Sequence, residues 1–232
     1  MDLEKKVLDL CNHNEYLKIY NNPVVKLFID ITKSTPFYGL LISLGDTVVG
    51  KLLIKGCAKK LKLVIDEVLN SKKPITNDML SDIDSIQSFR QMMMLVDKTN
   101  VNEKVILFAR LYKNSYFTDN RICNDEYEEY LHLLDELSFR EIDILIIYDK
   151  HLGVVDKLRC TVDKSTQYIE FISEVTRKYN MVENEIIDII ERLYSRGLCF
   201  LGVANYDNNI AISKVSFTTV YFKKFAKRIS GE

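Results

Sequence analysis

The amino-acid sequence predicts a mainly α-helical protein. Only 8 glycines and 3 prolines occur among 232 residues, so few positions interrupt a helix. Apolar residues recur at helical spacing through most of the chain, as Val105, Phe108, Ala109 and Tyr112 do. The content of 47% hydrophobic and 28% charged residues is typical of globular proteins. We therefore expect packed helices with a substantial core.

The first part of the chain is predicted to contain helices alone. Breaks at Asn21-Asn22-Pro23 and Ser34-Thr35-Pro36 separate the first elements, and Pro23 suits the first turn of a helix. Asn77 is a suitable N-cap for a helix that would turn Met79, Ile83, Ile86 and Met93 inward. The expected helices span residues 3–20, 23–31, 37–69 (with a kink at Gly56), 77–96, 103–116 and 125–137.

From Ser138 onward, strands are expected as well as helices. Ser138 and Glu141 have the spacing of a capping box, which predicts a helix start. Helices over 168–179 and 182–196 follow, and Gly197 is a natural stop. The runs CFLGVANY and NIAISKVSF predict two strands, and a helix over 220–229 ends the chain. We therefore expect a helical domain at 1–137 and a second domain at 138–232.

Two segments of the second domain carry a resemblance. ERLYSRGLCFLG looks like the exit of a third helix into a wing, and VSFTTVYFKKF looks like a strand entering a last helix through a threonine. The domain resembles a winged helix, although many of these have glycine where this chain has Val220. The resemblance implies an N-terminal helical bundle followed by a winged helix with a small two-stranded β-hairpin.

The first domain carries a second resemblance. Its glycine-rich apolar helix, the lysine-rich continuation and the helix EKVILFARLYKN are similar in arrangement to uncharacterised bacterial proteins, some of them prophage-associated. This resemblance implies no activity.

The cysteines and the first residues indicate a cytoplasmic protein. The five cysteines are odd in number and form no CxxC pair, so reduced thiols are expected rather than disulfides. The first residues, MDLEKKVLDL, lack the pattern of a signal peptide. The net charge of −1 provides no general attraction to nucleic acid or to anionic lipid.

No constellation of residues predicts catalysis, a cofactor or a metal. Cys11 and His13 could supply two ligands, whereas a structural zinc site needs four. His132 has acidic neighbours but no nucleophile motif beside it. Phosphate-binding glycine loops do not occur in the sequence. The chain is therefore expected to be non-enzymatic.

The segment from 37 to 56 is the most unusual in the sequence. Gly39, Ser43, Asp46 and Gly50 share one helical stripe, which suits close approach of a second helix. We expect a buried core helix here, and a protein that does not float with anionic liposomes. The alternative is a membrane-active effector, but Asp46 and Lys51 make spanning a bilayer costly.

The second domain leaves two further functions open. A DNA-binding regulator would read DNA with the helix over 182–196, yet that helix presents four acids outward, including Glu183 and Glu185. We therefore favour protein–protein interaction and place DNA and membrane second. The expected contacts to a partner or to DNA are Asn184, Arg192, Arg196, Lys214, Lys223, Lys224, Lys227 and Arg228.

Overall fold

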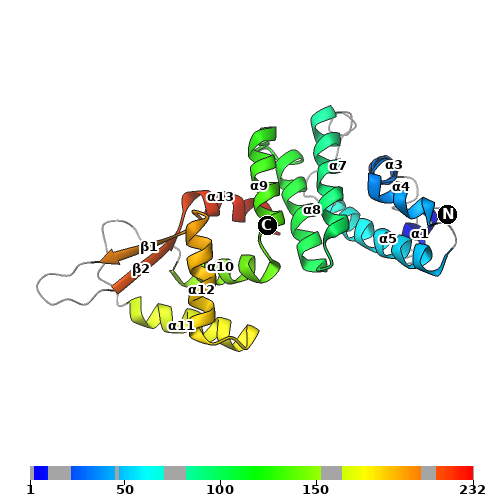
Figure 1. Ribbon diagram of the computed structural model, residues 1–232. Coiled ribbons are helices and arrows are strands. Elements are labelled where there is room, and N and C mark those ends of the chain that lie inside the picture. Colours follow the sequence, from blue (N-terminus) through cyan, green and yellow to red (C-terminus); the bar gives the residue numbers. More distant parts are fainter. Residues whose placement is uncertain are drawn as a thin grey trace, which may run out of the picture. The chain divides into compact units, whose positions relative to one another are not determined.

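The computed structural model describes residues 3–9, 22–44, 47–70, 82–152, 164–204 and 213–231 (Figure 1). The prediction of a mainly α-helical chain is confirmed, because helices form most of these residues. The N-terminal helices are α1 (Leu3–Leu8), α3 (Pro23–Lys33), α4 (Pro36–Ser43), α5 (Val48–Leu69), α7 (Ile83–Lys98), α8 (Asn102–Tyr116) and α9 (Asn124–Glu136).

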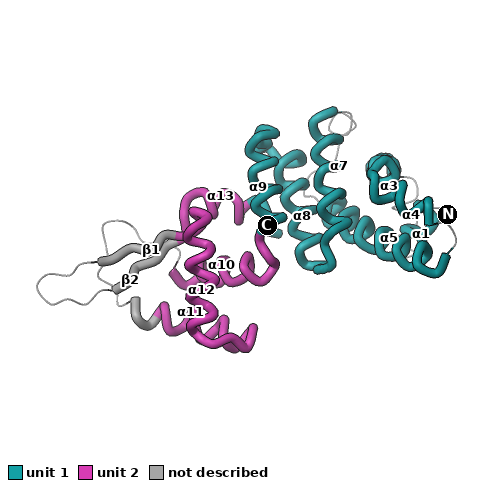
Figure 2. Tube along the Cα trace, in the orientation of Figure 1, with its two compact units in different colours: residues 1–136, 228–232 teal, residues 137–227 magenta. Residues whose placement is uncertain are grey.

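The described chain forms two compact units (Figure 2). Unit 1 contains residues 1–136 and 228–232, and unit 2 contains residues 137–227. The sequence places its domain boundary after Leu137, one residue later. It does not anticipate that the last five residues belong with the first unit. In unit 1 the Asn114 side-chain amide donates a hydrogen bond to the carbonyl of Arg228 at 2.8 Å.

Side-chain caps fix where the first helices begin. The Asn22 side chain accepts a hydrogen bond from the Val24 amide at 2.9 Å, and Pro23 occupies the first turn of α3 as predicted. Thr35 caps α4. Thr47 caps α5, because its hydroxyl accepts from the Gly50 amide at 3.0 Å. The prediction of one helix over 37–69 is therefore wrong: α4 and α5 are separate helices, and α5 continues through Gly56.

An aromatic cluster forms the core of unit 1. Phe28 of α3 and Phe89 of α7 stack with ring centroids 3.9 Å apart. Tyr112 of α8 meets Phe89 edge to face at 5.3 Å and lies 6.1 Å from Phe28. Phe117 and Tyr116 add further rings around Tyr112, each at 5.3 Å. The edge-to-face contacts of Tyr112 with Phe28, Phe89 and Phe117 have a favoured geometry for aromatic pairs. The cluster joins three helices.

The hydroxyl groups of this cluster are paired inside the core. The Tyr112 hydroxyl lies 2.7 Å from Ser85 Oγ, and the Tyr116 hydroxyl lies 2.5 Å from Ser88 Oγ. Both serines lie on the buried face of α7. Each pair satisfies two polar groups that would otherwise be costly to bury.

The inward face of α7 differs from the predicted one. Met93 is fully buried as predicted, but Ile83 is 67% exposed, and Phe89, which is not among the predicted inward residues, is fully buried. Asn77 and Met79 lie outside the described residues, and the described helix starts with Asp82 as its N-cap. Ser85 and Ser88, which bond the tyrosines, thus lie on the buried face of α7, where the sequence pattern predicts Ile83 and Ile86.

Unit 2 combines helices with a small sheet. Its elements are α10 (Phe139–Leu152), α11 (Lys164–Tyr179), α12 (Glu183–Ser195), β1 (Cys199–Ala204), β2 (Ser213–Thr218) and α13 (Val220–Ile229), the last two residues of which belong to unit 1. The strands pair antiparallel, with Cys199 opposite Thr218 and Ala204 opposite Ser213. Both strands lie within or overlap the predicted runs.

The helix start at Ser138 and the helix stop at Gly197 are confirmed. The Glu141 amide donates to Ser138 Oγ at 3.2 Å, and the Ser138 amide donates to the Glu141 carboxylate at 2.9 Å. Gly197 has a φ of 72°. Its amide bonds the Tyr194 carbonyl, and the Leu198 amide bonds the Leu193 carbonyl, which together form a Schellman motif.

Thr219 links the end of α12 to the start of α13. Its amide donates to the Leu198 carbonyl at 3.0 Å, and its hydroxyl donates to the Gly197 carbonyl at 2.9 Å. The same hydroxyl accepts from the Phe222 amide at 3.1 Å and so caps α13. One threonine therefore holds both the exit from α12 and the entry into the last helix.

Replacing Phe89 by alanine should destabilise unit 1 strongly. The change removes a fully buried ring that stacks on Phe28 and should cost about 3–5 kcal/mol. Met94→Ala on the same helix is the matched control, because Met94 is 41% exposed and should change stability by about 0.5 kcal/mol or less. Urea unfolding measures both. Equal effects would show that the aromatic cluster does not hold unit 1 together.

Replacing Gly197 by alanine should also destabilise the protein. A side chain at a φ of 72° is strained, so we expect a cost of about 1–2 kcal/mol although no atom crowds the position. Gly39→Ala, within helix α4 and equally uncrowded, should instead stabilise the protein by about 0.5–1 kcal/mol. Thermal unfolding should give opposite signs for the two variants. The same sign for both would contradict the motif.

Candidate functional site

The outward face of α12 is acidic. Ile186, Ile189, Ile190 and Leu193 are buried, and they form the inward stripe of the helix. The exposed residues include four acids, and the helix holds one base, Arg192. We call these acids the α12 acidic face: Glu183, Glu185, Asp188 and Glu191.

Two of the basic residues expected to contact a partner bind within the protein instead. Arg192 reaches from α12 to Glu141 of α10, with Nη2 3.3 Å from Oε1. The capping hydrogen bonds from Ser138 and the contact with Arg192 lower the pKa of Glu141 against the effect of its burial. Arg228 donates to the Asn114 carbonyl at 2.5 Å inside unit 1. The sequence pattern shows their charge but not these partners.

The remaining expected contacts are spread over several elements. Asn184 is exposed in the first turn of α12, and Arg196 is exposed just after the helix ends. Lys223, Lys224 and Lys227 are exposed on α13. Lys214 belongs to β2, and its side chain lies outside the described residues. Exposed basic groups are therefore concentrated on α13 rather than on α12.

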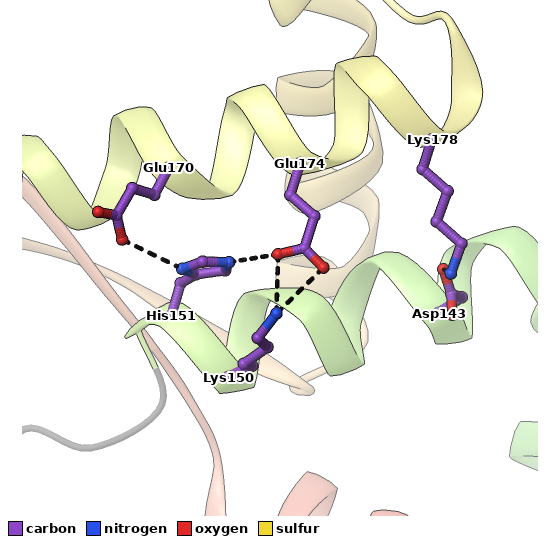
Figure 3. Close-up of polar contacts among 6 residues, drawn as sticks. All are labelled: Asp143, Lys150, His151, Glu170, Glu174 and Lys178. Atoms are coloured by element: carbon purple, nitrogen blue, oxygen red, sulfur yellow. Dashed lines mark hydrogen bonds and ion pairs between the residues drawn. The ribbon is translucent and has the colours of Figure 1, made fainter.

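A network of charged groups joins α10 to α11 (Figure 3). Glu174 of α11 lies 2.6 Å from His151 Nε2 and 2.9 Å from Lys150 Nζ. The hydrogen bond with His151 contributes most, and the one from Lys150 comes next; together they lower the pKa of Glu174 to about 2. The Lys178 ammonium lies 2.6 Å from Asp143, which also accepts from the Tyr179 hydroxyl at 2.7 Å.

This network is best explained as a link between two helices. Lys150 already pairs with Glu174 and Lys178 with Asp143, so these two carboxylates provide little attraction for an added ion. Glu170, Glu174 and Lys178 lie four residues apart along α11, a spacing visible in the sequence, but their partners on α10 become visible only in the fold.

The segment from 37 to 56 is not a buried core helix, so this prediction is wrong. Gly39 and Ser43 are exposed, Asp46 lies outside the described residues, and only Gly50 of the predicted stripe is buried. Large apolar side chains face outward instead. We call this group the α4–α5 surface: Leu40 at 58% exposure, Ile42 at 57%, Val48 at 74%, Val49 at 58%, Leu52 at 64% and Leu53 at 40%.

The reason lies in the buried face of α5. Ile54, Leu61, Val64 and Ile65 are fully buried, and they continue at helical spacing toward the end of the helix. A helix packed by this face points Val48 and Leu52 away from it. The sequence does contain the signal, because the lysines at 51, 55 and 59 recur every four residues beside the outward apolar positions.

A buried thiol on α5 and a buried acid on α7 face each other. The Cys57 thiol lies 4.0 Å from Asp97 Oδ1, and the Lys60 ammonium donates to the Asp97 backbone carbonyl at 2.7 Å. Burial raises the pKa of Asp97 to about 6, although Lys60 opposes this shift. Burial and the nearby Asp97 raise the pKa of Cys57 to about 12. At neutral pH this thiol is protonated and therefore a poor nucleophile.

The described residues provide no metal centre and no membrane-crossing helix. They contain no group of three histidine, cysteine or acidic side chains placed to hold a metal ion. His132 is exposed on α9, while Cys11 and His13 lie outside the described ranges. Within those ranges, every helix is too short or too polar to cross a bilayer.

Comparison of the chain with protein-family models, with curated proteins and with solved structures gave no match. Three exposed surfaces stand out among the described residues: the α12 acidic face, the basic side chains of α13, and the apolar and lysine-bearing surface of α4 and α5.

Asp97→Asn should stabilise the protein at neutral pH. The folded chain binds a proton at Asp97 below about pH 6, whereas the unfolded carboxyl binds one only near its ordinary pKa of 3.8. Stability from this group is therefore fully present below about pH 4 and is lost as the pH rises through 6. At pH 7 the variant should gain up to about 3 kcal/mol.

Urea unfolding at several pH values between 4 and 7 measures this effect. The gain of the Asp97→Asn variant should shrink as the pH falls toward 4. Asp125→Asn, at an exposed position on α9, is the control and should give no such trend. A destabilised Asp97→Asn variant at pH 7 would show that the charged carboxylate stabilises the fold.

Proposed function

We propose that the protein is a non-enzymatic binding protein whose unit 2 is a winged-helix-like module that contacts a partner protein. The observation that carries this proposal is the α12 acidic face. In a winged helix the third helix is the usual recognition element, and α12 takes that place in the order of unit 2. Its four exposed acids suit a basic protein segment better than a phosphate backbone.

Three features of unit 2 support the winged-helix arrangement. Helices α10, α11 and α12 precede a pair of antiparallel strands and a last helix. Gly197 ends α12 in a Schellman motif immediately before β1. Thr219 then caps α13 directly after β2. This order is also the one that the quoted sequence segments indicate.

DNA binding is the weaker candidate. Protein–DNA affinity depends on lysines and arginines that neutralise phosphates, with donors on the recognition helix reading the bases. On α12 the acids outnumber the bases, and Arg192 already binds Glu141. The exposed lysines of α13 would give contacts that weaken steeply with salt and carry no sequence information.

Affinity capture from the source cells tests the partner surface. We expect the full chain to retain one protein through α12. The double variant Asp188→Lys, Glu191→Lys should lower its recovery roughly tenfold or more, because like charges would then face each other. The matched control is the double variant Lys223→Glu, Lys224→Glu, which replaces two positive side chains of α13 by negative ones. This variant should retain the partner.

A titration with genomic DNA fragments at low and at physiological salt tests the alternative. We expect weak binding that disappears at physiological salt. Retention of one fragment at physiological salt, abolished by Asn184→Ala, would replace protein binding by DNA recognition as the function.

A further inference from the structure

The α4–α5 surface is apolar in a way that a folded monomer rarely leaves open. Four of its six side chains, Leu40, Val48, Val49 and Leu52, are between 58% and 74% exposed. Single exposed apolar residues are ordinary, but neighbouring ones on consecutive helices mark an interaction site. All six side chains are leucine, isoleucine or valine, so none of them can form a hydrogen bond.

Lysines border this surface. Lys51, Lys55 and Lys59 are exposed on α5 and follow one another every four residues, so they form a row along the helix. Lys33 and Lys62 lie against Asp30 and Asp66, and Lys60 donates to the Asp97 carbonyl, so the row of Lys51, Lys55 and Lys59 carries the positive charge beside the apolar side chains. The positive charge is thus concentrated where the apolar side chains are exposed.

From this combination we propose that the α4–α5 surface binds the surface of an anionic lipid bilayer. Aliphatic side chains can enter the boundary between headgroups and acyl chains, while lysines on the same helix reach the phosphates. The long lysine stems allow the ammonium groups to stay among the headgroups when the helix lies close to the bilayer. This inference reverses the expectation from the sequence, which rested on burial of residues 37–56.

The protein would lie on the bilayer and not cross it. The opposite face of α5 is occupied, because Ile54, Leu61 and Val64 are fully buried in unit 1. The outward side chains of α4 and α5 are therefore the part of these two helices that is available to lipid while the unit stays folded. Membrane contact then needs no unfolding of the core.

Two other occupants fit this surface less well. Protein interfaces are anchored mainly by tryptophan, tyrosine and arginine, and none of these belongs to the α4–α5 surface. A second copy of the chain, related by a two-fold axis, would bring the lysine rows of both copies together and add like-charge repulsion. An anionic bilayer meets both the apolar and the charged requirement.

Vesicle flotation of the full chain tests the proposal. The probes are phosphatidylcholine vesicles with and without phosphatidylserine. We expect flotation with the anionic vesicles alone, and weaker flotation as salt increases. Lys51→Gln, Lys55→Gln, Lys59→Gln should weaken partitioning roughly a hundredfold. The same three changes at Lys223, Lys224 and Lys227 of α13 are the matched control and should have little effect.

A second pair of variants tests the apolar contact. Leu52→Gln, Leu53→Gln should lower partitioning at least about tenfold, and Ile169→Gln, Val182→Gln, which changes exposed apolar residues of unit 2, should not. Circular dichroism and urea unfolding verify that each variant folds, as expected for changes at exposed positions.

Three results would overturn the proposal. The first is no flotation of the wild-type chain with anionic vesicles at low salt. The second is an equal loss with the α13 lysine variant, which would show general charge attraction. The third is a dimer of the wild-type chain in analytical ultracentrifugation that dissociates in the Leu52→Gln, Leu53→Gln variant. This would assign the surface to a second copy of the chain.

Discussion

The burial of Tyr112 is the constraint on which the arrangement of unit 1 depends. Its ring contacts aromatic rings from α3, α7 and α8, and its hydroxyl is buried with Ser85 as its hydrogen-bond partner. These requirements fix α3 and α7 against α8. Since α5 also packs on α8, it has one face for the core and leaves the other face outside. The exposed α4–α5 surface thus follows from how the core is filled.

In unit 2 the corresponding constraint is local. The left-handed Gly197 and the hydroxyl of Thr219 together fix how the chain leaves α12 and enters α13. This placement leaves the acidic face of α12 outside, because its isoleucines are taken by the core. The two candidate surfaces therefore have the same physical origin. In each case a helix packs one face into the core and exposes the opposite face to solvent.

Much of the fold could be predicted because its signals are local. The capping box at Ser138, the stop at Gly197 and the bounds of α13 follow from residue types at fixed spacing. The break before Thr47 is not visible in the hydrophobic pattern, because a run of leucine, isoleucine and valine resembles one continuous helix. Which apolar face is buried depends on partners distant in the sequence. The same holds for Arg192, Arg228 and the buried Asp97, whose roles are set by tertiary contacts.

The tyrosines of the core give the protein a distinctive optical behaviour in alkali. The chain has 13 tyrosines and no tryptophan, so its near-ultraviolet absorbance arises largely from phenol groups. Burial raises the pKa of Tyr112, Tyr127 and Tyr148 above the ordinary value of about 10. Above that pH the unfolded chain ionises while these phenols stay neutral in the fold, so stability falls. The absorbance of phenolate should then rise in two waves, and the second wave marks the opening of the core.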